Sequence, residues 1–487
     1  MNNLPEFDEV HVVSDLHMGG KAGFQILRET KRLANFILRL AAQRPKGRVA
    51  LVLNGDVFDT LAEDVAGFVA VDDAHIVLQR IMDDPSFAAI WEAMATFVRT
   101  SGRTLVFVIG NHDIEIAFPP VQRLLRARLA GDDLAAQARI EFSTAGAGYT
   151  CLVGGARIYC IHGNEVDGWN YNRYEDLAKV SRRMNAGMSL TQDEWKPNAG
   201  TRMVKQVMNT VKARYAWIDL LKPETSAAVG TLLVLDPSQA KKISELFGIV
   251  GERKRGDAEV DARLSAEGFV DPGPQAAPVM TLEQMIGPNL KREIGQHDDD
   301  MLLAAEKNLG KPKSTGAQPD ATLGTGQLVV DRLTGWLRGI STAEALRRAL
   351  RDWLEKDKTF DFKDRDDTFK QVTASVGPAI DFIVTGHTHL ERAIDMGQHR
   401  YYFNCGTWIR LLQFTPEMLA SEESFETIYK VLADGRMKAI DEAPAFVMDQ
   451  TSAVSISDDD GHVTGSLVHV EGDGTGAPRV IESFARS

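Results

Sequence analysis

The stretch Leu105–Asp113, LVFVIGNHD, indicates how the chain folds and where its chemistry lies. Its first five residues are apolar and include β-branched types, a composition typical of a buried strand. The run then stops at Gly110, and three polar residues follow it, Asn111, His112 and Asp113. Each of these side chains can bind a metal ion or take part in proton transfer. A single strand end of this kind is weak evidence for a functional site, so the question is whether the pattern recurs elsewhere in the chain.

Four other apolar runs end in the same kind of motif. They end in SDLH (14–17), GD (55–56), HGN (162–164) and GHTH (386–389). Ligands in open α/β sheets gather at the carboxyl ends of the strands, so the five motifs are expected to converge in space. The i, i+2 spacing in DLH and HTH places both ligand-type side chains on one face of an extended segment. Glycine usually stands beside or within these motifs, and it allows the sharp backbone exit that this convergence needs.

The side chains in these motifs are oxygen and imidazole nitrogen donors, with no thiolate. The candidate metal ligands are Asp15, His17, Asp56, Asn111, His162, His387 and His389. Such donors suit Mn, Fe, Zn or Mg. Seven donors are too many for one tetrahedral site but fit two adjacent ions that share a carboxylate. The predicted cofactors are therefore two divalent metal ions, with manganese preferred and iron, zinc or magnesium as alternatives.

The spacing of apolar residues alternates between strand-like and helical patterns, which indicates the α/β class. The predicted division is a core domain over 1–165 and 378–450, a helical cap over 166–250, a flexible linker or insertion over 251–330, a helical segment over 331–377 and a C-terminal β extension over 451–487. Gly, Pro and charge in the linker, including Pro-Gly-Pro at 272–274, support that interpretation. Capping-box spacing at 341–344 predicts a helix start, and turn signals at 433–435 and 459–461 predict hairpins.

Composition excludes several classes of protein. The chain has 487 residues, 44% hydrophobic and 25% charged, which is ordinary globular composition. Its formal net charge of −13 argues against wrapping extended duplex nucleic acid. Its three cysteines, Cys151, Cys160 and Cys405, form no CxxC pair, which favours a reducing compartment. The first residues do not resemble a signal peptide, and the apolar run 227–235 is too short to span a bilayer. A cytoplasmic protein is expected, and peripheral membrane contact stays open.

The five blocks, in this order, resemble the calcineurin-like metallophosphoesterase superfamily, whose pattern is DxH, GD, GNH[DE], a later histidine and GHxH. The resemblance covers residues 8–165 and 378–410. The SDLHMG start and the HG block that leads into a helical cap look most like the UDP-2,3-diacylglucosamine pyrophosphohydrolases. The resemblance implies a four-layer αββα sandwich with both metals at its rim.

The resemblance also implies a role for each matched residue. One metal would be held by Asp15, His17 and His389. The other would be held by Asn111, His162 and His387, with Asp56 bridging the two. His112 would donate a proton to the leaving oxygen or stabilise phosphoryl charge, and Asp113 would orient it.

Other residues carry open or ordinary interpretations. Asp59 is either a support for the site or a helix cap, and Asn54 and Asn164 are possible supports for the ligands. The histidines that match no motif are His11, His75, His297, His399, His462 and His469. The segment 202–222 is amphipathic and basic, which favours a helix packed on the core over a membrane or lipid contact. The predicted substrate contacts, just after the His162 block, are Trp169, Asn170, Arg173 and Tyr174.

The leading functional hypothesis is a dinuclear metal-dependent phosphoesterase. It would hydrolyse a phosphodiester, phosphomonoester or pyrophosphate bond of a small-molecule, nucleotide or lipid substrate by metal-activated water. One alternative is a metal-dependent nuclease or nucleotide phosphodiesterase, for which a basic cap leaves single strands open. The other is a non-catalytic scaffold of the same fold. The sequence leaves the substrate and the oligomeric state open.

Overall fold

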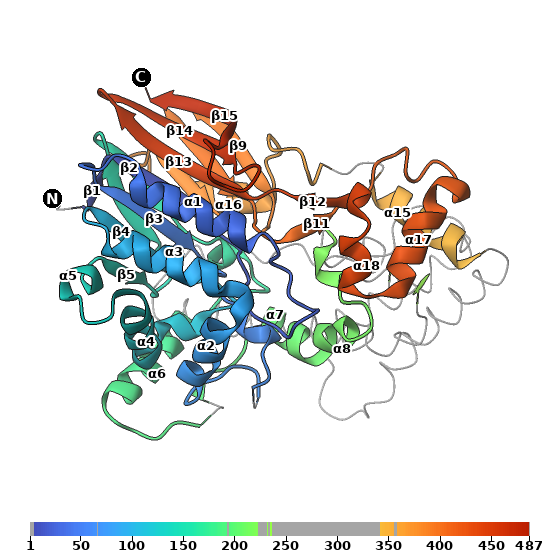
Figure 1. Ribbon diagram of the computed structural model, residues 1–487, viewed down its shortest axis with the longest axis horizontal. Coiled ribbons are helices and arrows are strands. Elements are labelled where there is room, and N and C mark those ends of the chain that lie inside the picture. The colour runs from blue at the N-terminus through green and yellow to red at the C-terminus, as the bar shows by residue number, and fades with distance from the viewer. Residues whose placement is uncertain are drawn as a thin grey trace, which may run out of the picture.

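Figure 1 shows the computed structural model, which describes residues 4–65, 67–191, 194–222, 231, 234–235, 341–354 and 358–486. The predicted flexible segment 251–330 and His297 lie outside these residues. Among the described residues, no helix is both long and apolar enough to cross a bilayer.

Seven strands form the first sheet, in the order β15-β14-β13-β2-β3-β4-β5. Their bounds are β2 Glu9–Val13, β3 Val49–Asn54, β4 Arg103–Val108, β5 Ile140–Ser143, β13 Ser452–Asp459, β14 His462–His469 and β15 Arg479–Arg486. Strands β2 to β5 are parallel, as expected for strands joined by helices. Strand β13 pairs antiparallel with β2, so the C-terminal strands extend the sheet that the N-terminal strands begin.

Six strands form the second sheet, in the order β1-β6-β7-β8-β10-β9. Their bounds are β1 Glu6–Phe7, β6 Tyr149–Val153, β7 Ala156–Cys160, β8 Phe382–Thr385, β9 Glu391–Gly397 and β10 Arg400–Cys405. Strands β7 and β8 are parallel neighbours although more than 200 residues separate them in sequence. This pairing brings the HG block and the GHTH block to the same edge of the sheet.

Helices cover both outer faces of the sheet pair. Those that follow the first strands are α1 Thr30–Ala42, α2 Ala74–Asp83, α3 Ala88–Arg99, α4 Pro119–Ala130, α5 Leu134–Gln137 and α6 Tyr174–Asn185, with short turns η1 Thr60–Ala62, η2 Pro85–Phe87, η3 Ile114–Ala117 and η4 Asn164–Val166. Helices α1 to α4 pack on the first sheet, and α16 (Asp367–Ser375) packs on the second. Apolar side chains of both sheets, such as Val12 and Ile158, fill the space between them. The predicted αββα arrangement is confirmed.

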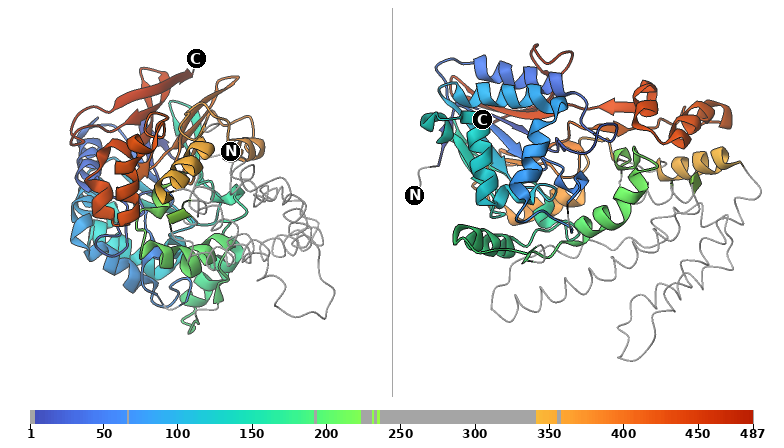
Figure 2. Two further views of the ribbon diagram at one scale, coloured as in Figure 1. Left: turned by 90° about the vertical axis from the view of Figure 1, so that its right-hand side faces the viewer. Right: turned by 60° about the horizontal axis from the view of Figure 1, so that its bottom comes forward.

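A second apolar cluster lies outside the sandwich, at one end of the molecule (Figures 1 and 2). Its elements are α7 Ala199–Met203, the π-helix η6 Val204–Met208, α8 Asn209–Lys212, η7 Ile218–Leu220, α15 Thr342–Leu354, β11 Arg410–Leu412, α17 Glu422–Asp434, α18 Met437–Asp441, η11 Pro444–Phe446 and β12 Val447–Asp449. Trp217, Leu346 and Phe425 meet in its interior. Residues 410–449 therefore pack with the cap segment rather than between the sheets, because their apolar side chains face it.

The two predicted hairpin turns behave differently. Asp460 and Gly461 join β13 to β14, and both have positive φ (54° and 85°), as a two-residue hairpin turn requires. The hairpin expected at 433–435 is wrong, because Gly435 (φ 81°) ends helix α17 instead. Helix α15 begins where the capping spacing predicts, and Ser341 Oγ accepts a hydrogen bond from Glu344 N at 3.1 Å.

The close packing of the sheets depends on Gly465 of β14. A Cβ at this position would lie 2.6 Å from the Phe382 ring and 3.1 Å from that of Phe403, both on the opposite sheet. We predict that Gly465→Val lowers the free energy of unfolding by about 1–3 kcal/mol through overpacking. The measurement is urea unfolding of the full chain. Thr464→Val, on the opposite side of the same strand, should stay within about 0.5 kcal/mol, and equal effects would contradict this account.

Candidate metal centre

The predicted ligands follow the carboxyl ends of five parallel strands. Asp15 follows β2, Asp56 follows β3, Asn111 follows β4, His162 follows β7, and His387 and His389 follow β8. Three of these strands belong to the first sheet and two to the second. The ligands therefore meet where the edges of both sheets come together.

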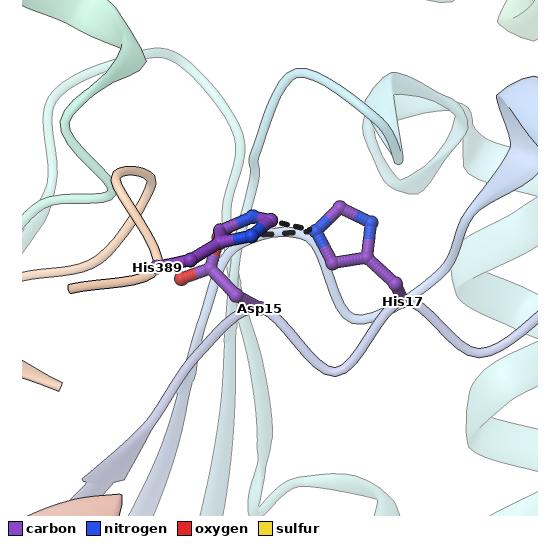
Figure 3. Close-up of side chains that lie close together, drawn as sticks. All are labelled: Asp15, His17 and His389. Carbon is purple, nitrogen blue, oxygen red and sulfur yellow. Dashed lines mark hydrogen bonds and ion pairs between the residues drawn. The ribbon is translucent and has the colours of Figure 1, made fainter. Parts of the chain in front are cut away.

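The structure gathers six of the seven predicted ligands in two groups of three. Asp15, His17 and His389 form the first group, and Asp56, His162 and His387 form the second; within each group the ligand atoms lie within 4.8 Å of one another. In the first group, shown in Figure 3, His17 Nε2 is 3.1 Å from His389 Nε2, which is 3.2 Å from Asp15 Oδ1. Three donor atoms thus point at one small volume.

Asp56 links the two groups. Its Oδ2 lies 3.7 Å from His17 Nε2 and 3.3 Å from His162 Nε2. Its Oδ1 accepts a hydrogen bond from the backbone N–H of His112 at 2.8 Å. Asn111, the seventh predicted ligand, is buried and directly precedes this N–H in the chain, so its backbone lies beside the same carboxylate. This is the place of the predicted bridging residue.

Several buried donor atoms lack a hydrogen-bond partner among the described residues. Asn111 Oδ1 has none, and Asp15 Oδ1 and His162 Nε2 make no well-aligned hydrogen bond but face other candidate ligands, His389 and Asp56. A buried polar atom without a partner costs about 1–3 kcal/mol, and native structures rarely leave one unexplained. Cations shared by these oxygen and nitrogen atoms would satisfy all three, so the residues present fit two divalent ions.

The backbone at the ligands is strained. Five of the ten non-glycine residues with positive φ in the described part of the chain are candidate ligands. They are Asp15 (54°), His17 (49°), Asp56 (51°), His387 (70°) and His389 (61°). Non-glycine residues in this region cost roughly 1–3 kcal/mol each and cluster at functional sites. The strain turns each ligand back toward the site immediately after its strand.

Two glycines leave room for the ligands to approach. A Cβ on Gly110 would overlap Asp56 Oδ1, and a Cβ on Gly55 would overlap the His162 ring. Any side chain at either position would displace a ligand. Glycine in the GD and GNHD motifs is therefore needed for close approach as well as for the turn.

His162 is held by the backbone of Asn54. Its Nδ1 donates to Asn54 O at 2.7 Å, so Nε2, which faces Asp56, is the nitrogen left to bind an ion when the ring is neutral. Asn54 thus supports the ligand through its carbonyl group. Although burial opposes the charged form, Asp56 raises the pKa of His162 to about 10 in the metal-free protein. The imidazolium then supplies the positive charge that a cation would otherwise bring.

His112 is oriented by Asp59, and the prediction that Asp113 orients it is wrong. His112 Nδ1 is 3.0 Å from Asp59 Oδ1. Asp113 faces inward instead, where its two oxygens accept from Gly110 N and Val57 N, each at 2.7 Å. Asp113 therefore shapes the GNHD turn, because those amides would otherwise be buried without acceptors. Asp59 also accepts from Ala62 N at 3.2 Å, so it is both a cap of η1 and a support for the site.

The predicted substrate contacts are largely engaged within their own loop. Asn170 Nδ2 donates to Asp167 at 2.6 Å, and Tyr174 Oη donates to Glu165 at 3.2 Å. Trp169 packs against the second apolar cluster, and Arg173 immediately precedes α6. Asn164 donates to Asn170 O, within the same loop, rather than to a ligand. Substrate contact by these side chains stays a prediction.

No sequence motif points to one residue at the site, Asp167. Its Oδ2 accepts from His387 Nε2 at 2.9 Å. Although burial opposes ionisation, this bond and the His387 charge lower the pKa of Asp167 to about 2. Asp167 lies five residues after His162 and matches none of the five blocks.

The calcineurin-like phosphoesterase family model matches residues 9–214. Over these residues the chain is similar to the family, which supports the superfamily that the five motifs indicate. The match contains the motifs from Asp15 to His162, whereas His387 and His389 lie beyond it and reach the same site through the pairing of β8 with β7. A search of curated proteins found no match to the chain.

The Asp59–His112 pair predicts a pH dependence of stability. Burial opposes the charged form of His112, but Asp56 and the hydrogen bond to Asp59 outweigh it and raise its pKa to about 9. Because this value lies above the ordinary 6.5, protonated His112 stabilises the metal-free fold below about pH 6.5. That contribution is lost as the pH rises through about 9.

We predict that Asp59→Asn lowers the pKa of His112 toward 6.5 in the metal-free protein. The mutant amide keeps the shape but removes the charge that favours imidazolium. NMR titration of the histidine C–H signals would measure the change. Asp113→Asn, which does not contact the ring, should leave the His112 pKa higher than Asp59→Asn does, and the reverse order would contradict the assignment.

Proposed function

We propose that the chain is a dinuclear metal-dependent phosphohydrolase that cleaves a phosphodiester, phosphomonoester or pyrophosphate bond. The observation that carries this proposal is the buried carboxylate of Asp56, shared between two groups of ligand-type side chains. The family match supports the same reaction class. Manganese is the proposed ion, with iron, zinc or magnesium as alternatives.

The protein's own residues would hold the ions and handle the proton. Asp15, His17 and His389 would hold one ion, Asn111, His162 and His387 the other, and Asp56 both. Two divalent ions, when bound, neutralise phosphoryl charge and lower the pKa of a water molecule. No covalent nucleophile is required, because phosphoryl transfer depends mainly on positioning and charge neutralisation.

His112 is suited to act on the leaving group. Its side chain is 19% exposed, whereas those of His17 and His162 are 3% and 0% exposed. The ring therefore reaches the surface of the site while still packing at 4.7 Å from the His17 ring. Asp59 holds Nδ1, so Nε2 is the nitrogen that can donate a proton to the leaving oxygen.

The cap segment adds positive charge beside this pair. Asn209 Nδ2 donates to Leu61 O at 3.0 Å, and Lys205 Nζ to Glu63 O at 2.8 Å, which attach the cap helix to the η1 loop. The charge of Lys212, which is paired with Asp219, helps to lower the pKa of Asp59 and partly opposes the rise in the pKa of His112. A cation so placed favours an anionic substrate, which supports a phosphorylated small molecule, nucleotide or lipid.

The charge of the protein bears on the nuclease alternative, and the strained, buried ligands bear on the scaffold alternative. A nuclease or nucleotide phosphodiesterase is favoured only by this basic cap, while the net charge of −13 opposes long nucleic acids. A non-catalytic scaffold would have no use for strained, buried ligands at this site. Cleavage of a UDP-diacylglucosamine-like lipid, peripheral membrane contact and a cytoplasmic location are proposals that rest on the sequence.

We predict that manganese-loaded protein hydrolyses an aryl phosphodiester and that EDTA abolishes the activity. Asp56→Asn should reduce turnover to background, because both groups lose their shared carboxylate. His112→Ala should reduce it by about 10²–10⁴-fold, the range for loss of a general acid. His75→Ala, at an exposed position of α2, is the matched control and should be unchanged. Full turnover by Asp56→Asn would exclude the dinuclear mechanism.

A substrate comparison separates the leading function from its alternatives. We expect small phosphodiesters and pyrophosphates to be cleaved while a labelled single-stranded oligonucleotide stays intact, because the negative chain repels polyanions. Chromatography would measure the release of UMP from a UDP-sugar lipid. A parallel assay would measure the length of the labelled oligonucleotide. Metal-dependent shortening of the oligonucleotide, impaired by His112→Ala, would instead establish the nuclease alternative.

A further inference from the structure

The loop that follows His162 holds a buried carboxylate against a ligand of the second group. Asp167 Oδ2 accepts from His387 Nε2 at 2.9 Å and from Asn170 Nδ2 at 2.6 Å. Its Oδ1 accepts from the backbone N–H of Trp169 at 2.8 Å. Three donors thus fix the carboxylate, and its orientation does not depend on the imidazole alone.

These contacts determine which nitrogen of His387 is free to bind. An ionised carboxylate can only accept, so His387 donates from Nε2, and in the neutral ring the lone pair is on Nδ1. His387 shares a group with Asp56 and His162, and its ring centroid lies 5.3 Å from that of His162. Its backbone is also restrained, since His387 N donates to Asp15 Oδ2 at 3.0 Å.

We propose that Asp167 is a positioning residue that fixes the tautomer and ring orientation of His387, and thereby the affinity of the second metal site. This inference rests on the proposed function. Carboxylates that accept from a metal-bound histidine typically change metal affinity about 10- to 100-fold when they are removed. Asp167 itself does not need to touch the ion or the substrate.

Helix α7, in the cap segment, is linked to the Asp167 carboxylate through Asn170. Gly200 N, in the first turn of α7, donates to Trp169 O at 2.8 Å. A Cβ on Gly200 would overlap the Asn170 side-chain oxygen. Helix α7 therefore packs directly on the residue that holds Asp167, and the geometry links the start of the cap to the second metal site.

The experiment measures manganese binding to the metal-free, full-length protein by isothermal titration calorimetry and by electron paramagnetic resonance. Wild-type protein should bind two ions and give the spin-coupled signal of a metal pair. Asp167→Asn should weaken one site about 10- to 100-fold and leave the other unchanged. At limiting manganese, its spectrum should show the six-line signal of an isolated ion.

Two controls separate this role from a general structural one. Asp176→Asn makes the same chemical change nine residues along the chain, at a carboxylate without a pairing partner among the described residues, and should bind as wild type. Gly200→Ala should weaken the second site in the same direction by displacing Asn170, whereas Gly377→Ala, with open space around its Cβ position, should not. Gly200→Ala also serves as the decisive variant should Asp167→Asn fail to fold.

The outcomes are distinguishable from those of the proposed function. This inference would be overturned if wild-type protein binds two ions and both Asp167→Asn and Gly200→Ala bind them with wild-type affinities. The phosphohydrolase proposal would then remain intact. Wild-type protein that binds no second ion would overturn both. Selective weakening of one site by Asp167→Asn supports the positioning role, because a loss of overall stability would affect both sites.

Discussion

The structure of the site depends on one buried charge, the carboxylate of Asp56. It is 1% exposed and lies between His17 and His162, where burial alone would raise its pKa. The positive charge of the surrounding histidines holds that pKa well below its usual range. An ionised carboxylate in such a place requires compensation of several kcal/mol. The compensation comes from His17 and His162, which the converging strand ends of the two sheets place beside Asp56. Gly110 leaves room for the carboxylate because it has no side chain.

Strained ligands persist only where the surrounding structure over-determines them. Buried amides provide this restraint. The side chain of Asn54, at the end of β3, donates to Ile161 O at 3.0 Å and to Val384 O at 3.4 Å, so it joins the first sheet to two strands of the second. Asn404 donates to Gly386 O at 2.8 Å and fixes the turn that precedes the two C-terminal ligands. The sandwich therefore holds the site rigidly through hydrogen bonds between its sheets.

The sequence predicted the α/β sandwich and the convergence of its ligands because both depend on short-range patterns, an apolar run followed by a motif. The resemblance implied Asp113 as the partner of His112, but Asp59 holds the ring although 53 residues separate the two in the chain. The backbone amides of Val57 and Gly110 decide this by capturing Asp113. Likewise, the sequence placed 378–450 in the core domain, because an apolar pattern does not say which partner buries it. Phe425 and Leu432 of α17 are instead buried in the second apolar cluster.

The loop after His162 shows why proximity to a metal rim does not by itself make a side chain a substrate contact. Leaving a rigid strand end at Gly163, the chain must satisfy the polar groups of a tight turn. Asn170 and Tyr174 do so, through Asp167 and Glu165. Because these polar residues are hydrogen-bonded to one another, a shift of one residue also shifts the groups that it binds. Helix α7 packs on Asn170, Asn170 donates to Asp167, and Asp167 accepts from His387. This chain of contacts connects the cap segment to the metal centre, although the two belong to different apolar clusters.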